Sequence, residues 1–122
     1  FKNLTNYIGS KSKYFMLPTQ TPKTETAWLA FPIIIKPKSP FTRLEIVTYL
    51  ENNKTQTRPV FTGNILKQPG FKKIENRKIS EALPNTELIM KNAFVLACHH
   101  GLNDAQITYL QNTIDAFLAK YE

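Results

Sequence analysis

The sequence predicts an α+β or α/β fold in which a small sheet is covered by helices. Two observations lead to this class. Nearly continuous apolar runs at 27–36 and 93–98 have the length and composition of buried strands, whereas the apolar residues of 104–121 recur at helical spacing. Elements of both kinds alternate along the 122 residues, a length that fits one domain with its own core. We therefore expect residues 1–122 to form a single domain.

The first third of the chain predicts a helix, a loop and a strand. Leu4, Tyr7 and Ile8 recur at helical spacing before Gly9, which predicts a helix at the start. A proline- and threonine-rich loop then leads into the run 27–36. That run has the composition of a strand buried on both faces, with Pro32 placing it at an edge or a bulge because proline has no amide hydrogen.

The middle of the chain begins with a helix and ends with a short one. Thr42 and Glu45 have the spacing of a capping box, which predicts a helix over about 42–52. A short extended segment should follow from Thr55 to Val60. Further along, Asn85 is expected to cap a short helix that runs through Met90.

The last third predicts a strand and the clearest helix. The run 93–98 is the second apolar strand. Asn103 and Gln106 have capping-box spacing, so the last helix should begin there and continue to Tyr121. Its apolar stripe must pack on a sheet to be buried.

Residues 57–71 are too irregular for a helix or a strand and read as a shaped loop. Prolines restrict the backbone, glycine permits a positive φ, and asparagine supplies an amide. An arginine at the start offers a planar, permanently charged group that suits a carboxylate or a phosphate. In chain order these residues are Arg58, Pro59, Gly63, Asn64 and Pro69. The alternative is an ordinary surface turn with an exposed arginine.

The formal net charge of +7 raises the possibility of a polyanion-binding module. The basic residues are spread along the chain, with one cluster at Lys67, Lys72, Lys73, Arg77 and Lys78. Zinc-finger, leucine-heptad and RNP-like patterns are absent, so we expect nucleic acid not to be the partner. A free-standing basic module, and a protein-interaction domain that uses an apolar helix face near Phe1, remain alternatives.

Catalytic and metal-binding motifs are weak within this sequence. Cys98, His99 and His100 are contiguous, and contiguous ligands rarely complete a tetrahedral site, so we expect no metal. No nucleophile elbow and no glycine-rich phosphate loop occur. No apolar run is long enough for a membrane span, and the single cysteine fits a cytoplasmic protein.

Several segments, in one order, resemble a known family. The loop carries Thr57-Arg58, Phe61, Gly63-Asn64, Gln68-Pro69 and Phe71, and further matches are Ala27 to Ile33, Phe41-Thr42-Arg43 with Tyr49-Leu50-Glu51, Leu83 to Thr86, and His100-Gly101-Leu102. They resemble the small C-terminal domain of the DegT/DnrJ/EryC1/StrS family of pyridoxal-phosphate-dependent sugar aminotransferases and dehydratases. Within that family they are most similar to the nucleotide-sugar 3-dehydratases of lipopolysaccharide biosynthesis. The resemblance covers nearly the whole chain.

This resemblance implies a small, mostly antiparallel sheet in the C-terminal domain of a fold-type I enzyme. The chain starts with Phe1, and we expect it to be part of a longer cytoplasmic protein that forms a homodimer. The Schiff-base residue and pyridoxal 5'-phosphate would belong to the large domain, so no catalytic residue and no bound cofactor are expected in this chain alone. The chain would be a lid over the site for a nucleotide sugar.

The resemblance also implies roles for individual residues. Arg58, Asn64 and His100 would face the substrate cleft: the arginine would pair with an anion, and the asparagine would hydrogen-bond a sugar. A turn-stabilising role is the alternative for His100. Phe61, Gly63 and Gln68 would support the loop.

Overall fold

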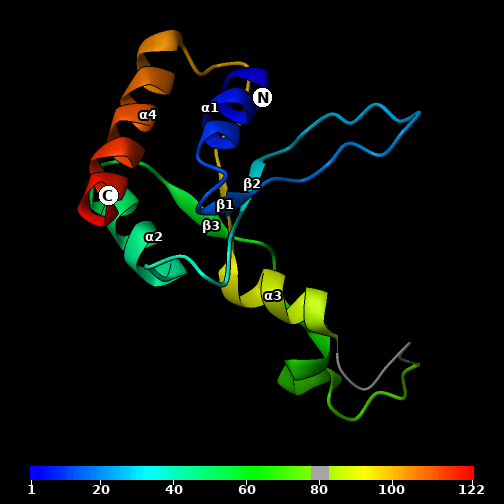
Figure 1. Ribbon diagram of the computed structural model, residues 1–122. Coiled ribbons are helices and arrows are strands. Elements are labelled where there is room, and N and C mark those ends of the chain that lie inside the picture. Colours follow the sequence, from blue (N-terminus) through cyan, green and yellow to red (C-terminus); the bar gives the residue numbers. More distant parts are fainter. Residues whose placement is uncertain (78–82) are drawn as a thin grey trace.

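The computed structural model describes residues 1–77 and 83–122, in which a four-stranded sheet lies against helices (Figure 1). The strand order is β1-β2-β4-β3, and every neighbouring pair is antiparallel. The strands are β1 (Phe15–Met16), β2 (Phe31–Ile35), β3 (Thr57–Pro59) and β4 (Ala93–Leu96), and the helices are α1 (Lys2–Ser10), α2 (Arg43–Asn52), α3 (Pro84–Asn92) and α4 (Asp104–Leu118). Three short 3-10 helices are η1 (Ile65–Lys67), η2 (Pro69–Phe71) and η3 (Ala119–Tyr121). The predicted fold class, with its antiparallel sheet, is confirmed.

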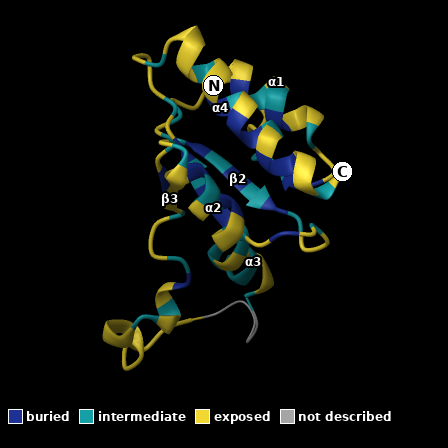
Figure 2. Ribbon diagram, turned by 90° about the vertical axis from the view of Figure 1, so that its left-hand side faces the viewer, coloured by how far each residue is buried: buried dark blue, intermediate teal, exposed yellow. Residues whose placement is uncertain are grey.

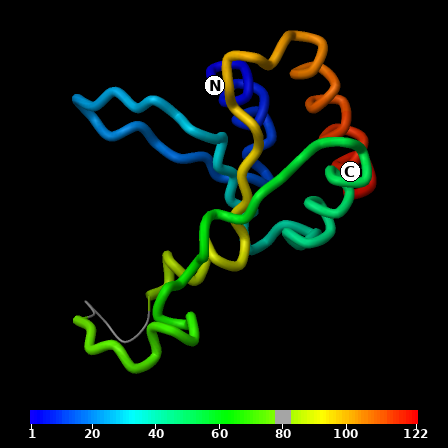
Figure 3. The backbone as a smooth tube through the Cα atoms, turned by 180° about the vertical axis from the view of Figure 1, so that it is seen from behind, coloured from blue at the N-terminus to red at the C-terminus, as the bar shows by residue number. Residues whose placement is uncertain are grey.

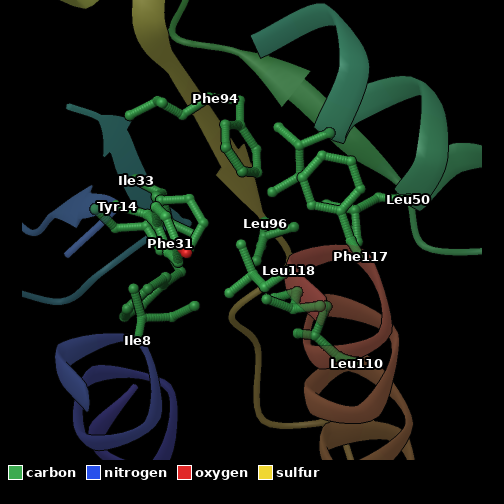
Figure 4. Close-up of a cluster of buried hydrophobic side chains, with 14 of the residues drawn as sticks. Ile8, Tyr14, Phe31, Ile33, Leu50, Phe94, Leu96, Leu110, Phe117 and Leu118 are labelled. Carbon is green, nitrogen blue, oxygen red and sulfur yellow. The ribbon is translucent and has the colours of Figure 1, made fainter. Parts of the chain in front are cut away.

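One face of the sheet forms the core and the opposite face stays partly open. Along β2, Phe31, Ile33 and Ile35 are buried, whereas the intervening Pro32 and Ile34 are only half-buried. The core face also receives side chains from three helices, including Ile8 of α1, Leu50 of α2 and Leu118 of α4 (Figure 4). Because side chains alternate along a strand, the residues between the buried ones lie on the other face. We call this the open face.

The expectation of a strand buried on both faces over 27–36 is therefore wrong. The strand begins only at Phe31, and Leu29 in the preceding bend is 87% exposed. Pro32 pairs with Val95 of β4, while β1 reaches only Ile34 and Ile35 on the other side. At Pro32 the strand is thus locally an edge, which is where a residue without an amide hydrogen can be accommodated.

The predicted helix starts depend on local capping and are mostly confirmed. Complete capping boxes open α2 at Thr42 and α4 at Asn103. The prediction for Asn85 is wrong: Leu83 is the N-cap of α3 and Pro84 its first residue. Proline suits this position because its fixed φ is helical and its missing amide hydrogen would have no partner there.

Two segments project from the body on the side away from α2 and α4, namely 17–30 and 60–77 (Figures 1 and 3). Both are largely exposed (Figure 2). The loop expected over 57–71 is only partly confirmed: its first three residues form β3, and the rest lies in the second segment, with the turns η1 and η2. Residues of both segments lie beside the open face of the sheet.

Candidate functional site

The sheet register places Arg58 on the open face. Arg58 of β3 is opposite Val95 of β4, and Val95 is in turn opposite Pro32 of β2. One guanidinium nitrogen, Nη1, donates to the carbonyl of Thr57 at 3.0 Å. No carboxylate of the described residues lies within ion-pairing distance of Arg58. Arg58 is exposed, and its remaining donors, which no described residue uses, are available to an anion.

A mainly apolar hollow of about 490 Å³ lies beside this guanidinium on the open face. We call it the open-face hollow. It is lined by Trp28, Leu29, Ala30, Pro32, Arg58, Pro59, Val60, Phe61 and Val95. Leu29 and Phe61 are 87% and 85% exposed, so two large apolar side chains stand at its rim. A single charged group in an apolar depression is a common arrangement for binding and orienting a ligand.

Glu51 fixes the start of β3 and hence the position of Arg58. Its Oε1 accepts hydrogen bonds from the backbone amide of Thr57 at 2.5 Å and from the Thr57 hydroxyl at 2.8 Å. These two hydrogen bonds lower the pKa of the Glu51 carboxyl below its ordinary value, and the positive charge of Arg58 adds to the effect. Thr57 itself is buried.

This lowered pKa predicts how the stability of the protein depends on pH. A carboxyl whose pKa is lower in the folded state stabilises the fold above its unfolded pKa of about 4.3, and this contribution is lost as the pH falls through the folded pKa. Glu51→Ala should therefore have a lower urea midpoint of unfolding than the unaltered protein at pH 7. The difference between the two midpoints should become smaller below about pH 4. Glu25→Ala, at an exposed position, is the control. A difference in urea midpoint that stays the same from pH 7 to below pH 4 would contradict this account of Glu51.

Asn64 is buried inside the loop, with 6% of its surface exposed. Its Oδ1 accepts from the amide of Leu66 at 3.1 Å, and its Nδ2 donates to Oε1 of Glu87 at 2.7 Å. Both ends of the amide are thus used within the protein. Asn64 shapes the turn into η1, and its contact with a sugar stays a prediction.

Gly63 and Gln68 occupy positions that hold the loop together. Gly63 has a φ of +71°, and a Cβ there would lie 2.6 Å from Cγ of Met90. Gln68 Nε2 donates to the carbonyl of Thr62 at 2.9 Å, which closes the loop on itself. Phe61 differs from both: its side chain points outward to the open-face hollow instead of packing inside the loop.

His100 lies at a second, neighbouring hollow. His99, His100, Lys2 and Trp28 are among the residues that line it, and Trp28 also lines the open-face hollow. The turn before α4 is stabilised by His99, whose Nδ1 accepts from the amide of Gly101 at 3.2 Å. His100 makes no side-chain hydrogen bond to another described residue. His99 thus makes the side-chain hydrogen bond of this turn, and both roles considered for His100 stay predictions.

The basic cluster is not uniform. Lys67 pairs with Glu87 at 2.5 Å, while Lys72, Lys73 and Arg77 are exposed. Lys78 lies outside the described residues. Within residues 1–77 and 83–122, no three potential metal ligands gather in one place, and no helix is long and apolar enough to cross a membrane.

The family model that describes the DegT/DnrJ/EryC1/StrS aminotransferase family matches residues 4–115. The chain belongs to this family. The lipopolysaccharide biosynthesis protein RfbH of Salmonella typhimurium is 32% identical over 117 residues, which are 96% of this chain and 26% of that protein. The dTDP-4-dehydro-2,6-dideoxy-D-glucose 3-dehydratase of Saccharopolyspora spinosa is 34% identical over 86% of this chain and 22% of its own length. This DegT-family chain thus spans about a quarter of the length of these relatives.

Solved structures agree with this DegT-family assignment. The E. coli GDP-4-keto-6-deoxy-D-mannose-3-dehydratase with bound hydrated PLP has a TM-score of 0.76 and 26% identity, over 92% of this chain and 29% of that one. An aminotransferase from Psychrobacter cryohalolentis has a TM-score of 0.81 at 13% identity, over 98% of this chain and 32% of that one, and this likeness shows the fold alone.

Two features of the DegT-family site were not anticipated from the sequence. Leu29 was assigned to a buried strand but stands at the rim of the open-face hollow. Glu87 was not singled out, although it binds two residues of the loop. A lone glutamate in a short helix carries no signal for such a contact, since its partners lie 20 and 23 positions away along the chain.

Proposed function

We propose that this chain is the C-terminal domain of a pyridoxal-phosphate-dependent nucleotide-sugar 3-dehydratase or aminotransferase of lipopolysaccharide deoxysugar biosynthesis. In this role the open face covers the cofactor and sugar-nucleotide site of a large domain in the same protein. The observation that carries the proposal is the guanidinium of Arg58, which lies in an apolar hollow without a carboxylate partner among the described residues. The similarity to two 3-dehydratases supports it.

The residues of the open-face hollow fit a covering role rather than a complete cofactor site. Among the described residues that line it, Arg58 is the one charged side chain and none is a lysine. Pyridoxal phosphate, when bound, supplies the electron sink for bond breaking next to the sugar carbonyl. This chain would contribute a positive charge for a phosphate or a donor carboxylate, and apolar walls that exclude water.

The other residues have narrower roles in this proposal. His100 faces the same cleft from the second hollow, next to the shared Trp28, and can donate to or accept from a sugar hydroxyl. Asn64 maintains the loop and reaches the sugar only if the turn opens. The complete protein would be a cytoplasmic homodimer whose partners are its own large domain and a nucleotide sugar.

The experiment is a direct assay of the complete protein. Pyridoxal phosphate added to the complete protein should stay bound through gel filtration, as measured by its near-ultraviolet or visible absorbance. A nucleotide-linked 4-keto-6-deoxysugar with glutamate should then lose its 3-hydroxyl, or gain an amino group, as measured by mass spectrometry of the product. Failure to retain the cofactor and to alter the sugar would contradict the proposal.

The net charge of +7 and the exposed Lys72, Lys73 and Arg77 favour one alternative, a free-standing basic module for polyanions. Retention on a phosphate-bearing resin should then fall steeply with salt and be abolished by alanine at these three positions. A protein that turns over the sugar and keeps this activity after the triple substitution would rule out a polyanion as its main ligand.

A further inference from the structure

Glu87 joins the loop to α3 through both of its carboxylate oxygens. Oε1 accepts from Nδ2 of Asn64 at 2.7 Å, and Oε2 accepts from Nζ of Lys67 at 2.5 Å. Hydrogen bonds from the Lys67 ammonium and the Asn64 amide lower the pKa of Glu87, so the carboxylate is charged at neutral pH. One side chain of α3 therefore holds two points of the loop that are three residues apart.

A neighbouring residue of α3 completes this attachment. Met90 lies one turn after Glu87, on the same side of the helix. Its sulfur accepts from the amide of Asn64 at 3.4 Å, and its side chain fills the space against Gly63. The loop thus contacts α3 at Gly63, Asn64 and Lys67.

Helix α3 is in turn fixed to the sheet. Arg43 Nη1 donates to the carbonyls of Met90 at 2.9 Å and Ala93 at 3.1 Å, and Nδ2 of Asn92 donates to the carbonyl of Ile35 at 2.9 Å. The position of the loop relative to the sheet is therefore set through α3. This matters for Phe61, which stands just before the attached residues and at the rim of the open-face hollow.

The backbone at Phe61, next to the attached residues, has an uncommon conformation. Its φ is +47°, although it is not a glycine, and its side chain is 85% exposed. A bulky residue keeps a positive φ only where the surrounding structure requires it. This uncommon backbone conformation lies two positions before Gly63, where the contacts of the loop with α3 begin.

We propose that Glu87 is a positioning residue that holds Phe61 at the rim of the open-face hollow and thereby sets the affinity for the sugar nucleotide. This inference rests on the proposed function and deepens it. Glu87 acts through Asn64, Lys67 and the loop backbone, and it does not touch the ligand. Loss of the Glu87 carboxylate should free the loop around Phe61 without disturbing the sheet, because the contacts of Arg43 and Asn92 remain.

The test compares Glu87→Ala, Glu87→Gln and Asn85→Ala in the complete protein. Asn85 is exposed on the same helix and serves as the control. Glu87→Ala should raise KM by up to about tenfold, because the released loop would hold Phe61 at the rim only part of the time, with a smaller change in kcat. Glu87→Gln keeps an acceptor for Asn64, so its KM should lie between the values of the unaltered protein and Glu87→Ala. Amide hydrogen exchange of residues 61–67 should accelerate in the same order.

The two proposals fail in different ways. Normal turnover with unchanged KM in Glu87→Ala would overturn the role of Glu87 and leave the proposed function intact. Unchanged exchange of residues 61–67 would overturn it as well, since the loop would then not depend on this carboxylate. Absence of turnover in the unaltered protein would overturn the proposed function, and the role of Glu87 with it.

Discussion

Arg58→Ala should lower kcat/KM of the complete protein about 100-fold, the usual scale for the loss of a charged hydrogen-bonding group that faces an anion. The variant should be nearly as stable to unfolding as the unaltered protein. The side chain donates one hydrogen bond, to the carbonyl of the preceding Thr57, and pairs with no carboxylate of the described residues. Activity should thus fall while thermal unfolding stays nearly unchanged.

Arg58→Lys separates the contribution of the charge from that of the guanidinium geometry, and Arg77→Ala is a control at another exposed arginine. Arg58→Lys keeps the charge but loses the planar fork, so it should recover only part of the activity. Arg77→Ala removes an exposed arginine from the same projecting segment and should leave kcat/KM unaltered. Equal rates for Arg58→Ala and Arg77→Ala would show that the guanidinium in the open-face hollow does not meet the substrate.

Gly63→Ala should destabilise the loop by about 2 kcal/mol. Two independent costs contribute: the φ of +71° disfavours any side chain, and the new Cβ would lie 2.6 Å from Cγ of Met90. The loop can shift only by breaking its contacts with α3. Amide exchange over residues 61–67 should accelerate, with a smaller effect on the sheet.

Gly70→Ala is the matched control for this substitution. Gly70 lies in the same loop, and no atom beyond its chain neighbours would lie within 4 Å of an added Cβ. Similar exchange rates in Gly63→Ala and Gly70→Ala would contradict this explanation of Gly63.

Features with local causes could be predicted from the sequence. Thr42 and Asn103 start helices because each cap needs only the residue three positions later. The cap predicted at Asn85 is wrong because Pro84 starts the helix one residue earlier, with its fixed φ in place of a side-chain cap. Strand β1 was missed, since two residues carry no periodic pattern and are extended only through pairing with β2.

In the candidate site, too, local features could be predicted from the sequence and long-range contacts could not. The residue chemistry around Arg58 and Gly63 was sufficient to identify the loop. Whether Leu29 is buried or exposed depends on where β2 begins, which tertiary packing decides. The contact of Asn64 with Glu87 joins residues 23 positions apart, so no local pattern could have revealed that the amide is already used.

Energy transfer from Trp28 tests most directly whether the open face covers a cofactor. Trp28 is the single tryptophan of this chain and lines the open-face hollow. Its emission can be isolated in the complete protein as the difference from a Trp28→Phe variant. This emission should lose most of its intensity when pyridoxal phosphate binds, with occupancy measured from the cofactor that co-elutes with the protein. Unchanged Trp28 emission at full cofactor occupancy would place the open face away from the cofactor and contradict the account.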